Sequence, residues 1–175
     1  MNDVFIEQLI KRKISGLGIL FRVLICAVVA FLALLMMFVF MVAGFYAMYV
    51  FFFVVLFCYL SYKVFQYTDI EYEYSYLNGE ITVDKIKGQL RRKNVEVFDI
   101  KNAELCAPLG SDVEKNHHPS ASNIPVKDLS SGFKNRAKYV VITNGKKGIT
   151  KIIFEPNGEI LTAMKNLRPR DVYLP

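Results

Sequence analysis

The strongest constraint on this chain is a run of residues without charge. Residues 23–62, between Arg22 and Lys63, contain no Asp, Glu, Lys, Arg or His. A single helix of these 40 residues would be about 60 Å long at ~1.5 Å per residue, against a bilayer hydrocarbon core of ~30 Å. Two helices fit that thickness, so the run predicts a membrane hairpin.

The Ala43-Gly44 pair near the middle of the run is where we expect the chain to turn. This places the spans at about Leu20–Val42 and Phe45–Tyr62, within a hairpin domain over residues 17–66. The alternative is a buried core hairpin in a soluble protein. The rest of the chain is too short to cover so much Phe, Leu, Val and Met.

Flanking cations predict the orientation of the hairpin. Lys11, Arg12, Lys13 and Arg22 precede the first span, Lys63 follows the second, and the turn between the spans is uncharged. Cytoplasmic loops carry an excess of Lys and Arg, so we expect a multi-pass protein of the cell membrane with both termini in the cytoplasm. A helical hairpin that does not cross fully is the alternative.

The three cysteines suit a reducing compartment. Cys26 and Cys58 lie in the predicted spans, Cys106 stands alone, and no CxxC pair occurs.

The first 16 residues form a separate amphipathic segment in this interpretation. Residues 2–13, NDVFIEQLIKRK, predict a short helix whose apolar residues cluster and whose basic end follows. Such a helix would lie in the membrane interface or pack on the cytoplasmic domain.

Beyond Gln66 the hydrophobic period changes to two, which is typical of strands. Asn78-Gly79 is a strong hairpin signal because a type I′ turn needs two residues with positive φ. This turn pairs Tyr76 with Ile81 and Tyr74 with Val83 on an inner face. It also sets Glu73 opposite Asp84, an unfavourable pair unless Lys85 and Lys87 screen it or a bulge near Ile86 shifts the register.

The remaining elements are assigned from pattern alone. We expect strands at 89–93, 95–100 and 103–106, then an irregular loop over 107–137, a second hairpin over 138–154, and a C-terminal helix. Ile160, Leu161, Met164 and Leu167 form the apolar stripe of that helix, and Pro169 ends it.

This order resembles the bacterial pleckstrin-homology-like (PH-like) membrane proteins. The beginning MNDVFIEQLIKRK and the ending FEPNGEILTAMKNLRPRDVYL are also similar to a family of small uncharacterised two-span membrane proteins of anaerobic Gram-positive bacteria. The resemblance implies an α+β membrane protein, in which the transmembrane hairpin precedes a small antiparallel PH-like domain over residues 67–175. It implies a lipid- or protein-binding module and supplies no catalytic residue.

Five cations within nine residues form the candidate contact site: Lys85, Lys87, Arg91, Arg92 and Lys93. They are either a solvated turn or a patch that returns to the membrane and contacts anionic lipid. The expected partners are the membrane, with an anionic lipid, a protein or a second copy as alternatives. Nucleic acid is not expected, because a net charge of +6 without a concentrated basic face is too mild.

We expect a non-enzymatic scaffold without cofactor or metal. The second hypothesis is a membrane-bound enzyme using the 107–137 loop, with His117 and His118 as metal ligands beside Cys106, Asp112 or Glu114, although no zinc spacing is present. The third is an accessory subunit of a transporter. Glu155, before Pro156, is expected to mark the start of the last helix.

Overall fold

The computed structural model describes residues 4–117, 124–145 and 148–174. The chain divides into two compact units. One contains Met1–Lys13, Ile70–Ile86 and Leu90–Pro175, and is called the sheet unit below. The other contains Ile14–Asp69 and Lys87–Gln89, and is called the hairpin unit.

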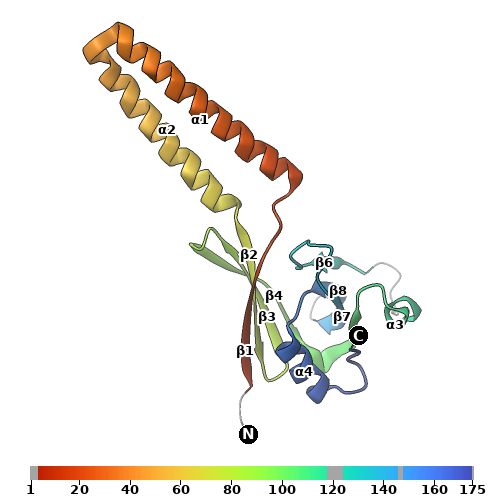
Figure 1. Cartoon of the computed structure of the whole chain (residues 1–175). Coiled ribbons are helices and arrows are strands. Elements are labelled where there is room, and N and C mark those ends of the chain that lie inside the picture. Colours follow the sequence, from red (N-terminus) through yellow and green to blue (C-terminus); the bar gives the residue numbers. More distant parts are fainter. Residues whose placement is uncertain (1–3, 118–123, 146–147, 175) are drawn as a thin grey trace. The chain divides into compact units, whose positions relative to one another are not determined.

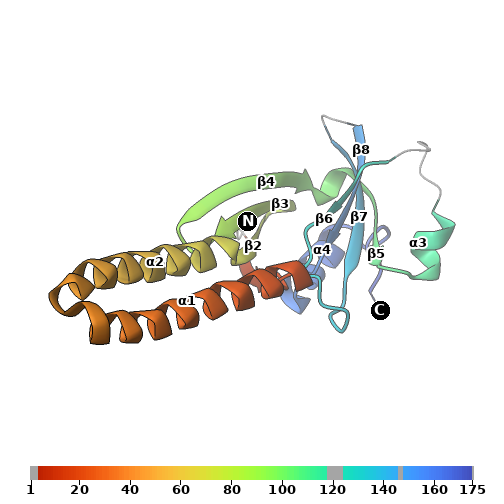
Figure 2. The same ribbon diagram turned by 90° about the horizontal axis from the view of Figure 1, so that it is seen from above.

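The hairpin unit consists mainly of two long apolar helices that run side by side (Figures 1 and 2). α1 covers Gly16–Ala43 and α2 covers Ala47–Thr68, with a 3₁₀ turn, Gly44–Tyr46, between them. Gly44 has a φ of 53°, which glycine adopts without strain, so the break lies at the predicted pair. Gly16–Val42 and Met48–Thr68 are long and apolar enough to cross a membrane, by length and composition.

The sheet unit holds two four-stranded sheets. The first has the order β1-β2-β3-β4, with β1 at Phe5–Lys11, β2 at Ile70–Leu77, β3 at Glu80–Lys87 and β4 at Arg91–Asp99. The second has the order β5-β7-β8-β6, with β5 at Ala103–Pro108, β7 at Tyr139–Gly145, β8 at Gly148–Phe154 and β6 at Val126–Asp128. A short 3₁₀ helix, Ile100–Asn102, joins the sheets, and helices α3 (Asp112–Asn116) and α4 (Gly158–Leu167) complete the unit.

The predicted N-terminal helix is wrong, because residues 5–11 form strand β1. β1 pairs antiparallel with β2 from Phe5 opposite Leu77 to Lys11 opposite Glu71. Ile6, Gln8 and Ile10 face inward, and the residues between them are exposed. A segment of seven residues fits both helical and strand spacing, and the open edge of the Tyr-rich β2 favours the strand.

The Asn78-Gly79 hairpin is confirmed. β2 and β3 are separated by these two residues, whose φ angles are 49° and 104°, as a type I′ turn requires. A Cβ at Gly79 would also lie 2.5 Å from Cδ2 of Leu167 in α4, so glycine is needed for space as well as for φ.

The middle of the chain differs from the prediction. The two strands expected at 89–93 and 95–100 are one strand, β4, which is long and strongly curved (Figure 2). The expected irregular loop over 107–137 contains α3 and β6, and β6 pairs in parallel with β8. Both elements are short, so neither produces a clear periodic pattern. The second hairpin, β7–β8, and the helix with the predicted stripe, α4, are present.

The two sheets and α4 share one core. The ring of Phe154 in β8 contacts Tyr74 of β2 and Phe98 of β4 edge-on, with centroid distances of 5.8 and 5.9 Å. Ile160 and Met164 of α4 are fully buried in the same cluster. Such edge-to-face aromatic pairs stabilise the folded state beyond the contribution of their buried apolar area.

Ile10→Ala tests the position of β1. Ile10 is 2% exposed, so its truncation is expected to lower the free energy of unfolding by about 2–4 kcal/mol. Leu77→Ala is the control, because Leu77 is 49% exposed in the paired strand β2 and should change stability by less than about 0.5 kcal/mol. The measurement is chemical unfolding of the full chain in detergent, followed by near-ultraviolet circular dichroism. Equal effects of the two substitutions would contradict the strand.

Candidate functional site

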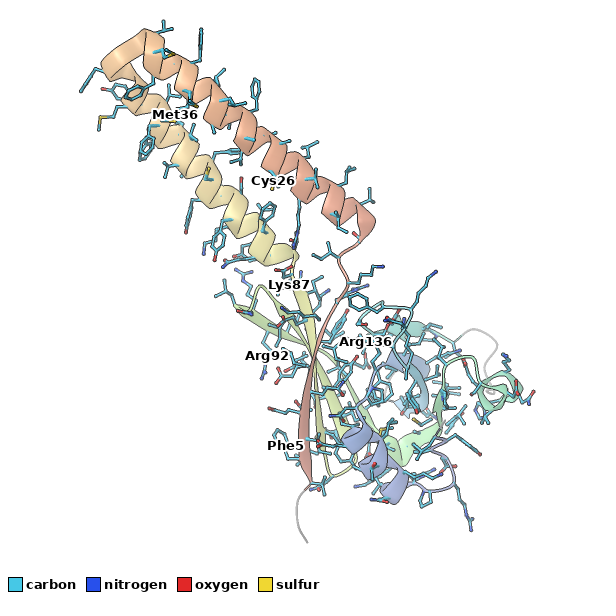
Figure 3. The ribbon with its side chains drawn as sticks, viewed as in Figure 1. Phe5, Cys26, Met36, Lys87, Arg92 and Arg136 are labelled. Atoms are coloured by element: carbon cyan, nitrogen blue, oxygen red, sulfur yellow. The ribbon has the colours of Figure 1, made fainter. Side chains whose placement is uncertain are left out.

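The five predicted contact residues flank the loop that joins β3 to β4. Lys85 and Lys87 lie in β3, and Arg91, Arg92 and Lys93 begin β4 (Figure 3). Lys87, Arg91 and Lys93 are exposed, and within the described part of the chain none of these three has an ion pair or side-chain hydrogen bond. They are therefore the cations of this group that remain available for an external anion.

Arg92 has a different environment from these three. Its guanidinium forms an ion pair with the buried Glu73 and lies 3.7 Å from the carboxylate of Asp84. The Asn94 amide also donates a hydrogen bond to Asp84 over 2.9 Å. Arg92 thus contacts both carboxylates of the expected like-charge pair. A buried carboxylate that loses its cation is costly, so Arg92 has a structural role.

The β3–β4 loop is fixed to the end of α2 within the hairpin unit. The Gly88 N–H donates a hydrogen bond of 3.0 Å to the carbonyl of Asp69, the residue after α2. A Cβ at Gly88 would lie 2.5 Å from the carbonyl oxygen of Gln66 in the last turn of α2. Gly88 and Gln89 have φ angles of 57° and 58°. The loop therefore places Lys87 next to the end of a candidate membrane helix.

Arg22 closes the base of the helical hairpin. Its guanidinium donates to Oδ1 of Asp69 over 2.6 Å, to Oγ1 of Thr68 over 2.5 Å and to the carbonyl of Phe65 over 3.4 Å. A cation at the C-terminus of a helix satisfies free carbonyls and the negative end of the helix dipole. The last cation before the apolar run and the first carboxylate after it therefore form a pair.

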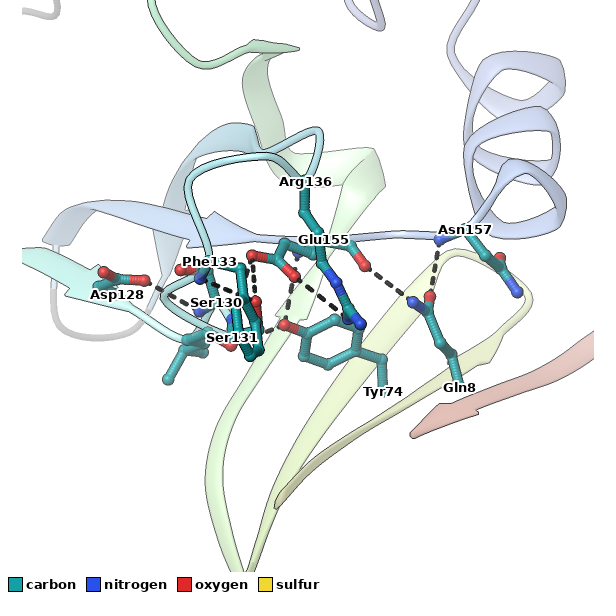
Figure 4. A network of polar contacts seen from close by, with 10 residues as sticks. Gln8, Tyr74, Asp128, Ser130, Ser131, Phe133, Arg136, Glu155 and Asn157 are labelled. Carbon is teal, nitrogen blue, oxygen red and sulfur yellow. Dashed lines mark hydrogen bonds and ion pairs between the residues drawn. The ribbon is translucent and has the colours of Figure 1, made fainter. Parts of the chain in front are cut away.

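A second polar cluster lies inside the sheet unit, around Glu155 (Figure 4). Glu155 is 4% exposed, and its Oε1 accepts hydrogen bonds from the Ser131 hydroxyl over 2.8 Å and from the Ser131 N–H over 3.2 Å. Its Oε2 lies 3.9 Å from the guanidinium of Arg136. Glu155 is thus a buried structural carboxylate, whereas α4 begins later, with Asn157 as its cap.

This cluster ties β1 and the 129–136 segment to the core. The Gln8 amide donates to the Glu155 carbonyl over 2.9 Å and accepts from the Asn157 N–H over 2.7 Å. The Tyr74 hydroxyl donates to the Leu129 carbonyl over 2.6 Å, and burial raises the pKa of Tyr74 above its ordinary value. Tyr74 therefore stays protonated and serves as a hydrogen-bond donor.

Of the residues considered for an enzyme, those that the structure describes have separate partners. Cys106 is fully buried, and burial raises the pKa of its thiol to about 12. Glu114 binds Lys151 over 2.6 Å, and His117 lies 3.7 Å from Glu104. His118 lies outside the described residues. Among the described residues, no group of three His, Cys, Asp or Glu side chains could hold a metal ion.

The family model "Bacterial PH-like domain (DUF6106)" matches residues 2–174. The chain belongs to this family. Because the match includes β1, both apolar helices and α4, this PH-like family combines the hairpin with the sheets in one pattern. No curated protein and no solved structure matches the chain. The family has no known function, so membership shows the fold and leaves the activity open. An origin in anaerobic Gram-positive bacteria stays a prediction.

Gly88→Ala tests how the loop of this PH-like protein is anchored. The substitution adds left-handed strain of about 1–2 kcal/mol and also a contact with the Gln66 carbonyl. Gly110→Ala is the control, because Gly110 has a φ of 82° but open space around its Cβ. We expect Gly88→Ala to lower the free energy of unfolding by at least about 1 kcal/mol more than Gly110→Ala. Equal losses would mean that the loop does not pack on α2.

Cys106 is expected to resist alkylation in the folded chain. The thiolate is the reactive form, and a pKa of about 12 keeps the thiol protonated at pH 8. In a Cys26→Ser, Cys58→Ser background, iodoacetamide labelling at about pH 8 should be far slower than in denaturant, because the folded chain buries the thiol and keeps it protonated. Rapid labelling of the native chain would restore Cys106 as a candidate nucleophile.

Proposed function

We propose that this chain is a non-enzymatic two-span protein of the cell membrane, with both termini in the cytoplasm, whose PH-like domain contacts anionic lipid and serves as a scaffold. The contact is made by Lys87, Arg91 and Lys93, together with the exposed Leu90 between them. The observation that carries the proposal is the Gly88–Asp69 hydrogen bond, which fixes the β3–β4 loop to the end of α2.

Charge and exposure support the lipid contact. Leu90 is 64% exposed and is flanked by cations that have no anionic partner among the described residues. A cation near an anionic leaflet contributes about 1 kcal/mol of attraction, and an apolar side chain beside it can enter the headgroup region. Three such cations flank the β3–β4 loop and would together attract it to the leaflet.

The proposed orientation in the membrane is supported by the charges at the end of the hairpin where α1 begins and α2 ends. Arg22 and Lys63 flank the uncharged run, and Arg22 pairs with Asp69 beside the β3–β4 loop. Basic residues favour the cytoplasmic side, so this end is assigned to the cytoplasm. Two observations support the non-enzymatic role. Cys106 is buried, and each of two candidate carboxylates has a structural partner: Ser131 for Glu155 and Lys151 for Glu114.

Leu90→Trp gives a direct test, because the natural chain contains no tryptophan. In nanodiscs that contain brominated anionic lipid, we expect the fluorescence of the introduced tryptophan to be strongly quenched. The triple variant Lys87→Gln, Arg91→Gln, Lys93→Gln should reduce this quenching, since it removes the attraction to the leaflet. The Leu90→Trp chain with its natural cations should also be quenched less in zwitterionic nanodiscs that contain brominated lipid than in anionic ones.

Two controls make the result specific. Lys115→Gln, Lys134→Gln, Arg170→Gln removes the same net charge from other exposed positions and should leave the quenching unchanged. Val126→Trp reports on an exposed strand of the second sheet, since Val126 is 58% exposed. If Leu90→Trp is quenched no more than Val126→Trp, the lipid contact is wrong.

A further inference from the structure

Strand β1 has one open edge. It is the terminal strand of the order β1-β2-β3-β4, so only one side of it is paired. The Arg12 N–H donates to the Ile70 carbonyl over 2.9 Å, and the Asn78 N–H donates to the Val4 carbonyl over 3.3 Å. Hydrogen-bonded pairs alternate along an antiparallel ladder, so the even-numbered residues of β1 bond to β2. The N–H and C=O groups of Phe5, Glu7, Leu9 and Lys11 therefore point to the open edge.

This edge is accessible and apolar. Phe5 and Leu9 are 58% and 56% exposed, Phe5 projects from the strand in Figure 3, and Glu7 and Lys11 are exposed beside them. Within the described residues, the edge-facing N–H and C=O groups of Phe5, Glu7, Leu9 and Lys11 have no backbone hydrogen-bond partner. The next such group along the chain, the Lys13 N–H, donates to the Ser131 carbonyl over 2.7 Å. An uncovered edge with exposed apolar side chains is a template for pairing with another strand.

The charges on the edge are complementary to those of a second copy. If two β1 strands pair antiparallel about Leu9, Leu9 lies opposite Leu9 of the partner subunit. Glu7 then lies opposite the partner's Lys11, and Lys11 lies opposite the partner's Glu7. The Glu7 carboxylate has no cation partner among the described residues, so it is free to make this contact.

We propose that β1 pairs with β1 of a second copy in this register, joining two four-stranded sheets into one continuous sheet. Neighbouring registers are less favourable. Centring on Gln8 sets Glu7 opposite a leucine, and centring on Glu7 sets two carboxylates opposite each other. The Leu9-centred register forms an ion pair on each side of the centre and about six backbone hydrogen bonds between the strands.

The dimer does not require lipid contact by Lys87, Arg91 or Lys93, so the two proposals can fail separately.

Oxidative cross-linking of the full chain in detergent tests the register. In a Cys26→Ser, Cys58→Ser background, Leu9→Cys should give a disulfide-linked dimer, because directly opposed Cα atoms are about 5.5 Å apart. Phe5→Cys is the matched control. The two copies of this residue would be about 26 Å apart along the strand, so it should remain monomeric. If Leu9→Cys cross-links no more than Phe5→Cys, the register is wrong.

A charge exchange tests the ion pairs. Glu7→Lys and Lys11→Glu should each weaken dimerisation about tenfold or more in sedimentation equilibrium, and the double variant should restore it. Lys11 also lies 3.6 Å from Glu71 of its own chain, but that contact is lost equally in Lys11→Glu and in the double variant. The rescue therefore reports on the partner, and a double variant no tighter than either single change would overturn the proposal.

Leu9→Pro separates pairing from folding. The N–H of Leu9 points to the open edge, so proline removes an intermolecular donor and keeps the ladder to β2. The variant should keep the near-ultraviolet circular dichroism of the natural chain and be monomeric. A folded Leu9→Pro variant that still forms the dimer would show that the two copies meet elsewhere.

Discussion

The rest of the structure depends on how the ends of an uncharged 40-residue run are satisfied. Arg22, the last cation before the run, binds Asp69, the first carboxylate after it, and also the free carbonyl end of α2. Asp69 in turn accepts the Gly88 N–H through its backbone carbonyl. One residue thus joins the base of the hairpin to the β3–β4 loop.

The features visible in the sequence were those determined by local pattern. The break at Ala43-Gly44, the Asn78-Gly79 turn and the stripe of α4 each follow from residues within a few positions of one another. Strand β1 could not be predicted in this way, because its seven residues fit both a helix and a strand. The choice depends on β2, which follows much later in the chain, beyond both apolar helices.

The candidate site shows the same limit. The sequence identified the five cations but not that Arg92 binds Glu73 and Asp84, since that pairing depends on how β3 and β4 meet. The Glu155 cluster was missed because Gln8 and Glu155 are 147 positions apart. The Arg22–Asp69 pair was within reach of sequence reasoning, because these opposite charges flank the apolar run at the base of the hairpin.

Contact between the β3–β4 loop and an anionic leaflet is the feature on which the proposed function depends. Lipid-borne spin labels in nanodiscs test it through the broadening of backbone amide signals in the full chain. We expect strong broadening at Gly88 and Leu90 in anionic nanodiscs, and weaker broadening at both in the triple variant Lys87→Gln, Arg91→Gln, Lys93→Gln. Broadening at Gly88 and Leu90 that is equal in the natural chain and the triple variant, or absent from both, would contradict the lipid contact.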